Sequence, residues 1–353
     1  MSRASSAAYQ TVGLISNPLL HGKFGFGSGF DFYDDFTIIY DMAASIPGEQ
    51  TETLVSERST GERLTQLAMQ RLGRMDPERP FFLFVFYFDP HYDYRPPAPY
   101  DRQFCDADYR GAQDGGGIPA LAGQPVSAAD RRQVIGLYDG EVCFTDAQIG
   151  RLLAALKRRG CADNTVVVVT ADHGEEFWDH GGVVHGHTLY DELVRVPMIV
   201  RFPPAVRPGT VVNRSVCHAD LLPTVLELAG VPIPPQTRGR SLVPLFSGGS
   251  HGLDPPAFMG ATVSHNLTGA RTPRQKIVLQ GDGAKRFYSL PDDPGEATNL
   301  WGTARTAEFA DLERRFAEWK SRMDQCARQA APTGTPDLDQ RLLQQLRSLG
   351  YAR

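Results

Sequence analysis

The chain has 353 residues, of which 41% are hydrophobic and 22% charged, the composition of an ordinary globular protein. Its formal net charge of −5, without a long run of Lys or Arg, argues against nucleic acid as the main partner. The five cysteines are scattered without CxxC spacing, which excludes a disulfide framework or a zinc knuckle as the organising feature. The most apolar run, residues 81–88, is too short to span a membrane.

In chain order, strands and helices alternate over most of the sequence. Four apolar runs predict strands, at residues 11–15, 81–88, 165–170 and 196–202. Two of these runs, 81–88 and 165–170, do not alternate with polar residues, so we expect those strands to be covered on both faces. Helical spacing over 129–159 and 221–230 predicts two helices. This order indicates an α/β fold with a parallel or mixed sheet.

The texture of the sequence changes after about residue 240. Residues 248–256, GGSHGLDPP, are typical of a linker. Three short strand-like pieces follow, at residues 257–262, 276–280 and 287–290. Residues 303–328 then show a charged helical pattern. We therefore predict a main domain over residues 1–247 and a C-terminal subdomain of short antiparallel strands plus a helix over residues 257–353.

The segment 170–197 carries the most chemistry. Asp172 and His173 directly follow a predicted strand, at the edge where ligands bind in open α/β sheets. An adjacent carboxylate and imidazole can ligate one divalent cation, and Glu175 is close enough to support those ligands. Four of the nine histidines fall within this segment, namely His173, His180, His185 and His187. The alternative is that Asp172 caps the next segment and the histidines are exposed loop residues.

A second candidate lies just beyond residues 81–88. His91 follows that strand, so its side chain and those after residues 165–170 could reach one crevice. The alternative is a loop histidine that stacks on Tyr92 or Pro96. Asp89 and Asp93 flank it, and because Pro90 follows Asp89 we interpret both carboxylates as turn residues.

These segments together resemble the sulfatases of the alkaline phosphatase superfamily. FFLFVFYFDPHYDYRPPAPY is similar to their apolar strand, Pro-His and Pro-rich turn, and VVVVTADHGEEFWDHGGVVHGHTLYDELVRVP to their Asp-His-Gly-Glu and His-Gly-x-x-Leu-Tyr-Asp-Glu arrangement. DLLPTVLELAGV and FYSLPDDPGEATNLW resemble later parts of the family pattern, and the likeness runs from about residue 12 to 351. It implies an alkaline phosphatase-like α/β fold, with a mixed, mostly parallel sheet flanked by helices and a small C-terminal α+β subdomain.

The resemblance also implies roles for individual residues. Asp172 and His173 match the downstream ligands of one divalent metal ion, which we expect to be calcium. His91 and His185 match the histidines that contact the sulfate group and serve the leaving oxygen. Three further residues are candidates for the pocket or the surroundings of the metal: Glu175, His180 and His187. The expected reaction is hydrolysis of a sulfate ester, carried by a small molecule or a glycan, with a cation on the sulfuryl oxygens and an acid near the bridging oxygen.

The nucleophile is the main departure from the family pattern. Sulfatases carry Cys-x-Pro-x-Arg, or a Ser variant, and convert that Cys to formylglycine. No cysteine of this sequence has such a context, so we assign no nucleophile to it. We expect the nucleophile and its formylglycine to lie in residues that precede Met1, and we expect this chain to be inactive alone. Two alternatives stay open: a phosphodiester or phosphonate monoester hydrolase on the same scaffold, and a noncatalytic sulfatase-like remnant.

Overall fold

The computed structural model describes residues 9–35, 60–249, 255–261 and 266–329. They form two compact units, which we call the N-terminal unit (described residues up to 162) and the C-terminal unit (described residues from 163 onward). The predicted boundary near residue 247 remains a prediction. Short 3-10 helices join the larger elements, at Pro18–Leu20, Gly22–Phe24, Ile118–Leu121, Ala162–Asn164, His218–Asp220, Val243–Ser247 and Ala304–Phe309.

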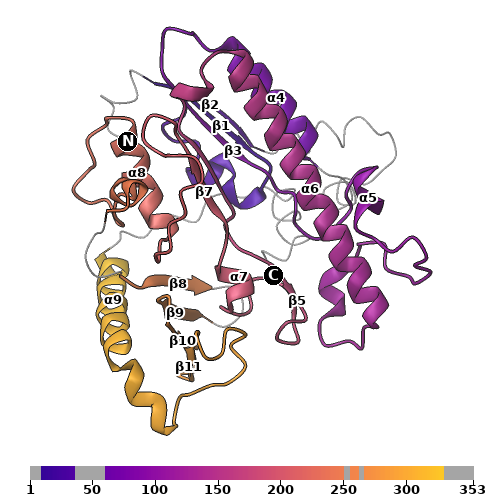
Figure 1. Cartoon of the computed structure of the whole chain (residues 1–353), viewed down its shortest axis with the longest axis vertical. Helices are drawn as coiled ribbons and strands as arrows, with labels where there is room; N and C mark the ends of the chain where they lie inside the picture. Colours follow the sequence, from indigo (N-terminus) through magenta and orange to yellow (C-terminus); the bar gives the residue numbers. More distant parts are fainter. Residues whose placement is uncertain (1–8, 36–59, 250–254, 262–265, 330–353) are drawn as a thin grey trace. The chain divides into compact units, whose positions relative to one another are not determined.

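A three-stranded parallel sheet forms the centre of the N-terminal unit. Its strands are β1 (Gln10–Ile15), β2 (Phe32–Asp35) and β3 (Phe81–Phe86), in the order β2-β1-β3 (Figure 1). β1 is buried along most of its length because it lies between two neighbours. Gly13 is required here, since a Cβ at that position would lie 2.6 Å from the Tyr33 ring. The close strand-to-strand packing therefore depends on the absence of a side chain.

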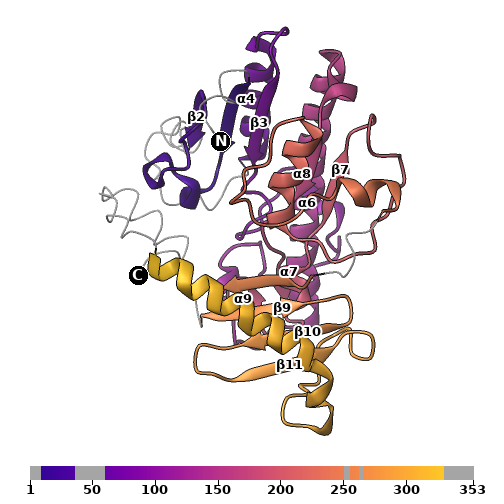
Figure 2. The ribbon, with the colours of Figure 1, turned by 90° about the vertical axis from the view of Figure 1, so that its left-hand side faces the viewer.

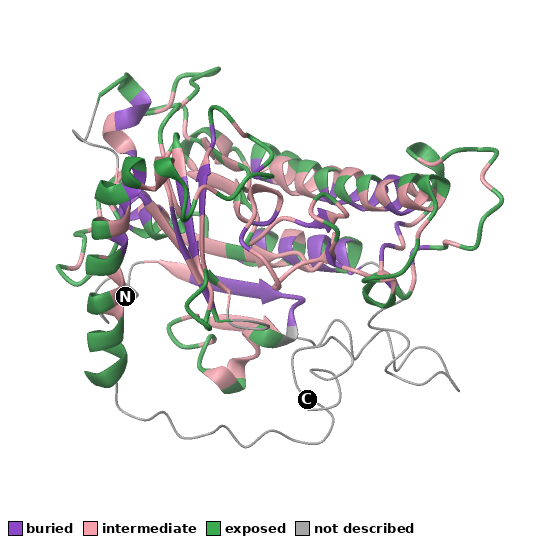
Figure 3. Cartoon of the chain, turned by 90° about the horizontal axis from the view of Figure 1, so that it is seen from below, coloured by how far each residue is buried: buried purple, intermediate pink, exposed green. Residues whose placement is uncertain are grey.

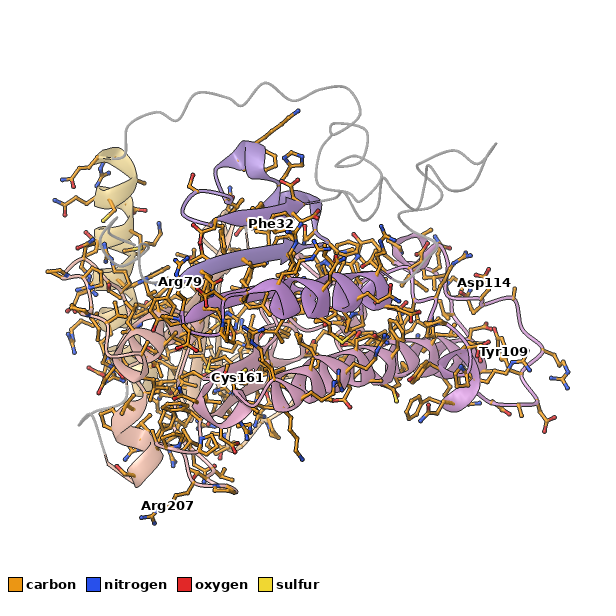
Figure 4. All side chains as sticks on the ribbon, turned by 90° about the horizontal axis from the view of Figure 1, so that it is seen from above. Phe32, Arg79, Tyr109, Asp114, Cys161 and Arg207 are labelled. Carbon is orange, nitrogen blue, oxygen red and sulfur yellow. The ribbon has the colours of Figure 1, made fainter. Side chains whose placement is uncertain are left out.

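Two long helices, α4 (Gly61–Arg74) and α6 (Ala128–Arg158), pack together in the same unit. The short helix α5 (Tyr100–Gln103) lies between them in the sequence. Ser127 caps α6 by accepting a hydrogen bond from the Asp130 backbone N–H. After α6, the guanidinium of Arg159 donates to the carbonyls of Leu72 and Met75, which ties its end to the end of α4. Figure 4 shows α4 beside the sheet, with Phe32 labelled on β2.

The C-terminal unit contains an antiparallel strand pair and two short helices before its larger sheet. β4 (Val167–Thr170) pairs with β7 (Met198–Arg201), and the two-residue strands β5 (Glu176–Phe177) and β6 (Val183–Val184) form a hairpin between them in sequence. α7 (Asp191–Val194) and α8 (Leu221–Leu228) follow. The β5–β6 hairpin matters most for function because it folds the histidine-rich segment back on itself.

A four-stranded antiparallel sheet completes this unit. Its strands are β8 (Ala257–Ala261), β9 (Leu267–Arg271), β10 (Gln275–Leu279) and β11 (Lys285–Ser289), in the order β11-β10-β9-β8. The helix α9 (Ala310–Gln329) lies against it (Figure 2). Phe287, Phe309 and Phe316 join sheet and helix in one apolar cluster, while the outer face of α9 is exposed (Figure 3). The amphipathic pattern of the helix thus buries one side only.

The predicted α/β fold with a C-terminal strand sheet is confirmed, with some differences in its elements. The sequence analysis did not identify β2, α4 or β9. The strand predicted over residues 81–88 ends at Phe86 and is not covered on both faces, since Phe84 is 39% exposed. An unbroken apolar run does not reveal what will cover it. No helix in the described part of the chain is both long and apolar enough to cross a membrane.

Candidate active site

Asp172 and His173 lie immediately beyond β4, as predicted. β4 reaches this point paired with β7, and the Thr170 hydroxyl donates to the Pro197 carbonyl at 2.8 Å, which ties the strand end to the segment before β7. The Asp172 carboxylate is about half exposed, and its Oδ1 accepts a hydrogen bond from the His173 backbone N–H. Asp172 Oδ2 and His173 Nε2 are 3.7 Å apart. The two side chains therefore point into the same region.

Their chemistry fits two ligands of a divalent cation. His173 Nδ1 donates to the Gly174 carbonyl at 2.8 Å, which leaves Nε2 as the nitrogen with a lone pair in the neutral ring. That nitrogen and the Asp172 carboxylate supply one N and one O donor. Among the residues that the structure describes, no third His, Cys, Asp or Glu completes a cluster of three potential ligands. The predicted pair is thus compatible with a metal, and its role as ligands remains a prediction.

His185 lies next to this pair. Its ring stacks near that of His173, with centroids 3.9 Å apart and an interplanar angle of 30°. Its Nδ1 donates to Glu175 Oε1 at 2.8 Å, and both side chains are largely buried, at 10% and 4% exposure. The carboxylate fixes the orientation of the ring and keeps a proton on Nδ1. Glu175 therefore supports His185, whereas the sequence analysis related it to the metal ligands.

His187 also pairs with a carboxylate, as His185 does. Its Nε2 donates to Glu176 Oε2 at 2.8 Å, and Glu176 is fully buried. The other oxygen of Glu176 accepts the backbone N–H groups of His180 and Gly182, at 3.0 and 2.7 Å. A Cβ at Gly182 would collide with the His187 ring at 2.5 Å, so this position needs glycine. Glu176, which the sequence analysis did not single out, holds the turn of the hairpin together.

His180 is tied into the protein by both ring nitrogens. Nδ1 lies 2.6 Å from Glu192 Oε1, Nε2 lies 2.9 Å from the Gly295 carbonyl, and the ring stacks on Tyr190 at 3.5 Å. Both partners are acceptors, so only the protonated ring satisfies both contacts. Burial opposes the charged form, but the hydrogen bond to Glu192 and its charge outweigh burial and raise the pKa of His180. These contacts give His180 a structural role in joining the hairpin to the segment before Glu296.

Behind this segment lies a buried charge network that the sequence analysis did not foresee. Lys276 is completely buried and contacts Asp191 Oδ1 at 3.0 Å and Glu296 Oε1 at 2.8 Å. Arg271 adds a two-pronged contact to Asp191, with N–O distances of 2.9 and 2.7 Å. Burial raises the pKa of Asp191, but the hydrogen bond from Arg271 and the charge of Lys276 outweigh it, so the pKa falls to about 2. Through Asp191, the network anchors α7 to Arg271 of β9 and to Lys276 of β10.

His91 belongs to the N-terminal unit and is only 8% exposed. Its ring lies between Phe88 and Tyr92, with centroid distances of 4.2 Å to each, and Nδ1 contacts the Tyr92 carbonyl at 2.7 Å. The alternative raised from the sequence was a histidine stacked on Tyr92; the ring does contact Tyr92, at an interplanar angle of 36°, but it stacks on Phe88. That His91 and His185 share one crevice remains a prediction.

The two carboxylates beside His91 do more than form turns. Asp89 Oδ2 accepts hydrogen bonds from the backbone and hydroxyl of Thr60, the residue before α4. Asp93 Oδ1 accepts the Ile118 backbone N–H at 3.2 Å. Glu141 of α6 is buried, and its Oε1 accepts the Arg95 backbone N–H at 2.7 Å. Burial, followed by the charge of Asp89, raises the pKa of Glu141 well above its ordinary value. These acids hold the loop that carries His91.

That no cysteine of this chain serves as the nucleophile remains a prediction. All five are free thiols in the structure, and burial raises the pKa of both Cys105 and Cys217. A raised thiol pKa reduces the thiolate fraction at neutral pH, and the thiolate is the reactive form. This agrees with the absence of the family's cysteine motif from the sequence.

Comparisons with known proteins identify the family. The Sulfatase family model matches residues 5–231, and the model described as N-sulphoglucosamine sulphohydrolase, C-terminal, matches residues 179–322. N-acetylglucosamine-6-O-sulfatase of Bacteroides thetaiotaomicron is 29% identical over 201 residues, which are 53% of this chain and 36% of that enzyme. The chain thus spans about a third of the length of this curated relative.

Solved structures agree on the fold. A structure in complex with its substrate D-glucosamine-2-N,6-O-disulfate matches with a TM-score of 0.69 and 20% identity, over 96% of this chain and 83% of that one. A phosphonate monoester hydrolase from Silicibacter pomeroyi matches with a TM-score of 0.74 and 21% identity, over 90% of this chain and 79% of that one. Both likenesses concern the alkaline phosphatase-like fold, and the sequence match decides the family. With the Asp-His pair at its strand end and a family model covering well over half of its length, this chain belongs to the sulfatase family.

Proposed function

We propose that this protein acts as a sulfuric ester hydrolase that uses one divalent cation. In this proposal Asp172 and His173 are metal ligands, and His185 and His91 contact the sulfate group or the leaving oxygen. Glu175 positions His185. The observation that carries the proposal is the contact between His173 and His185, with ring centroids 3.9 Å apart, beside the Asp172 carboxylate just beyond the end of β4.

The chemistry of a sulfate ester suits this arrangement. The leaving group departs as an alkoxide, so a proton delivered to the bridging oxygen lowers the barrier. His185 is held with Nδ1 toward Glu175, and in the protonated ring Nε2 is the atom that could donate that proton. A bound cation would supply positive charge for the sulfuryl oxygens. The largely buried setting of His185 and Glu175 strengthens such electrostatic contacts.

The metal can be tested by calorimetry. The family resemblance favours calcium, whereas an imidazole ligand such as His173 is more typical of zinc and other transition metals. We expect weak binding of a divalent cation, since only two ligands come from the described residues, and we expect Asp172→Ala to weaken it about tenfold or more. Asp282→Ala, which removes an exposed carboxylate from a turn of the same unit, is the control. Submicromolar binding that survives Asp172→Ala would refute these ligands.

Glycan sulfates are the proposed natural substrates. The curated relative acts on N-acetylglucosamine 6-O-sulfate by its name, and one structural neighbour was solved with a glucosamine disulfate as its substrate. The competing function is phosphonate monoester hydrolysis, which the likeness to the Silicibacter pomeroyi enzyme favours. Both reactions place a tetrahedral oxyanion at the same kind of site, so the two must be separated by activity.

Turnover measurements decide between them. The protein is produced from the longest open reading frame that contains this sequence and assayed with 4-nitrophenyl sulfate, 4-nitrophenyl phenylphosphonate and glucosamine 6-sulfate. We expect the highest kcat/KM with a sulfate ester and loss of activity after treatment with a chelator. Faster hydrolysis of the phosphonate would establish the competing function. A folded, metal-loaded protein that cleaves none of the three would favour the noncatalytic alternative.

A further inference from the structure

A cavity of about 220 Å³ lies in the C-terminal unit, between residues 187–190, which end the histidine segment (residues 173–190), and the four-stranded sheet. The histidine segment contributes His187, Thr188, Leu189 and Tyr190 to its lining, and β9, β10 and β11 with the turn after β10 contribute Leu267, Val278, Gln280, Arg286 and Tyr288. Figure 1 shows these strands side by side. Of the residues named above as candidates for the metal, for sulfate contact or for their surroundings, only His187 is among the residues that line this cavity.

The charge of the lining is positive. Arg286 is the only Lys or Arg among the lining residues, and no Asp or Glu lines the cavity. Within the described part of the chain no carboxylate forms an ion pair with Arg286. Its Nη1 instead donates to the Tyr190 hydroxyl at 2.8 Å, and the Tyr288 hydroxyl lies 3.4 Å from that of Tyr190. A guanidinium has five N–H donors, so these phenols leave donors for a ligand.

The setting holds the guanidinium in place. Arg286 is the second residue of β11, where it is paired in register with Val278 of β10. Tyr288 is buried, and Tyr190 is fixed by stacking on the His180 ring. Leu189, Leu267 and Val278 form an apolar cluster in the same lining. A rigid cation against an apolar wall is suited to an oxyanion, because the planar guanidinium binds carboxylate and sulfate oxygens through paired N–H groups.

The size of the cavity limits the ligand. Pockets for drug-sized molecules measure about 300–1,000 Å³, so a space of about 220 Å³ takes a single charged substituent or one small ring and not an oligosaccharide. Gln280 and Thr188 add neutral hydrogen-bonding groups around the cation. His187 also lines the cavity, and it is two residues from His185 in the sequence.

We infer that this cavity is a subsite for an oxyanion, sulfate or carboxylate, carried by a sugar unit of the substrate other than the one whose ester is cleaved. Arg286 binds the anion, and Gln280 and the phenols of Tyr190 and Tyr288 complete the polar surroundings. The identity of the substrate as a glycan rests on the proposed function, whereas binding of an oxyanion to the cavity does not. Glycans that carry several anionic groups would therefore bind better than uncharged aryl esters.

Binding is measured by calorimetry and by NMR titration of the purified chain with three probes: glucosamine 6-sulfate, glucuronate and inorganic sulfate. Arg286→Gln should weaken binding of the sugar anions about tenfold or more, as expected when a charged hydrogen bond is lost. Gln280→Glu introduces a carboxylate into the lining that holds Arg286, without removing a buried side chain, and it should also weaken binding. Arg274→Gln, at an exposed arginine of the β9–β10 turn, is the matched control and should bind like the wild type.

His185→Ala separates this subsite from the candidate active site, because it should leave the binding of glucuronate, which carries no sulfate ester, to the cavity intact. Saturable sugar-anion binding that falls in Arg286→Gln and Gln280→Glu, but not in Arg274→Gln or His185→Ala, supports the subsite even if no sulfatase turnover is found. Equal binding by wild type and a folded Gln280→Glu protein would overturn it. A protein that binds inorganic sulfate but binds neither glucosamine 6-sulfate nor glucuronate would also overturn it. Loss of binding in His185→Ala alone would assign the anion to the active site instead.

Discussion

Replacing His185 with alanine should lower kcat for an aryl sulfate by about a hundredfold or more, the usual contribution of a positioned acid or base. The imidazole is buried beside His173 and oriented by Glu175, so its loss removes a proton donor and one hydrogen bond to the buried Glu175 carboxylate. Glu175→Gln should have a smaller effect, about tenfold, because the ring stays and the amide oxygen can still accept its hydrogen bond, but the negative charge beside the ring is lost. The measurement is steady-state kinetics on the active protein, with folding checked by circular dichroism.

His180→Gln is the matched control for this prediction. His180 lies in the same segment, but both of its ring nitrogens contact protein acceptors, Glu192 and the Gly295 carbonyl. Its loss should reduce stability by about 2 kcal/mol, as for a hydrogen bond to a charged group, and change kcat much less than His185→Ala does. If a folded His185→Ala enzyme retained wild-type turnover, His185 would have no place in the mechanism.

Asp191→Asn should destabilise the protein by about 3–5 kcal/mol, the cost of removing one partner from a buried ion pair. The change keeps the size of the side chain but removes the charge that faces both Lys276 and Arg271. Lys276 is completely buried, so solvent cannot replace the lost interaction. Urea unfolding followed by tryptophan fluorescence gives the free energy of unfolding.

A surface pair provides the control and pH provides a second test. Glu313→Gln breaks the pair between Lys285 and Glu313, whose side chains are about one third exposed, and should lower the free energy of unfolding by about 1 kcal/mol or less.

Because the pKa of Asp191 is lowered to about 2, its stabilising charge is fully present above the pKa of the unfolded state and is lost as pH falls toward 2. The difference between wild type and Asp191→Asn should therefore shrink below about pH 4. A difference that stays constant down to pH 3 would contradict this assignment.

The two networks suggest a division of labour within the C-terminal unit. The pairs His185–Glu175 and His187–Glu176 orient imidazoles around the strand end. The charges of Asp191, Lys276 and Arg271 instead fix the end of the segment to the antiparallel sheet. Mutations of His185 and Glu175 should therefore act mainly on turnover, and mutations of Asp191, Lys276 and Arg271 mainly on stability. The proposed subsite at Arg286 belongs to neither network.

The sequence by itself determined the features that depend on local order along the chain. Asp172 and His173 follow β4 directly, so recognising the strand was enough to place them at its end. The helix α6 was predicted to within one residue because the apolar spacing and the basic residues at its C-terminal end agree. α4 was missed although Leu64, Ala68 and Leu72, spaced four apart, are buried on one face. That helix could have been predicted from its periodicity.

Only the tertiary structure decided which carboxylate each histidine meets. The partners of His180, His185 and His187 lie ten to twelve residues away, and the β5–β6 hairpin selects them, with strands of two residues that no periodicity reveals. From the sequence, Lys276 resembles an ordinary charged residue of a strand. It is nevertheless buried against Asp191, and the sequence does not reveal this pair because Asp191 lies 85 residues earlier. Pairing across such separations depends on how the chain packs, and the cost of burying a charge is met only once its partners are in place.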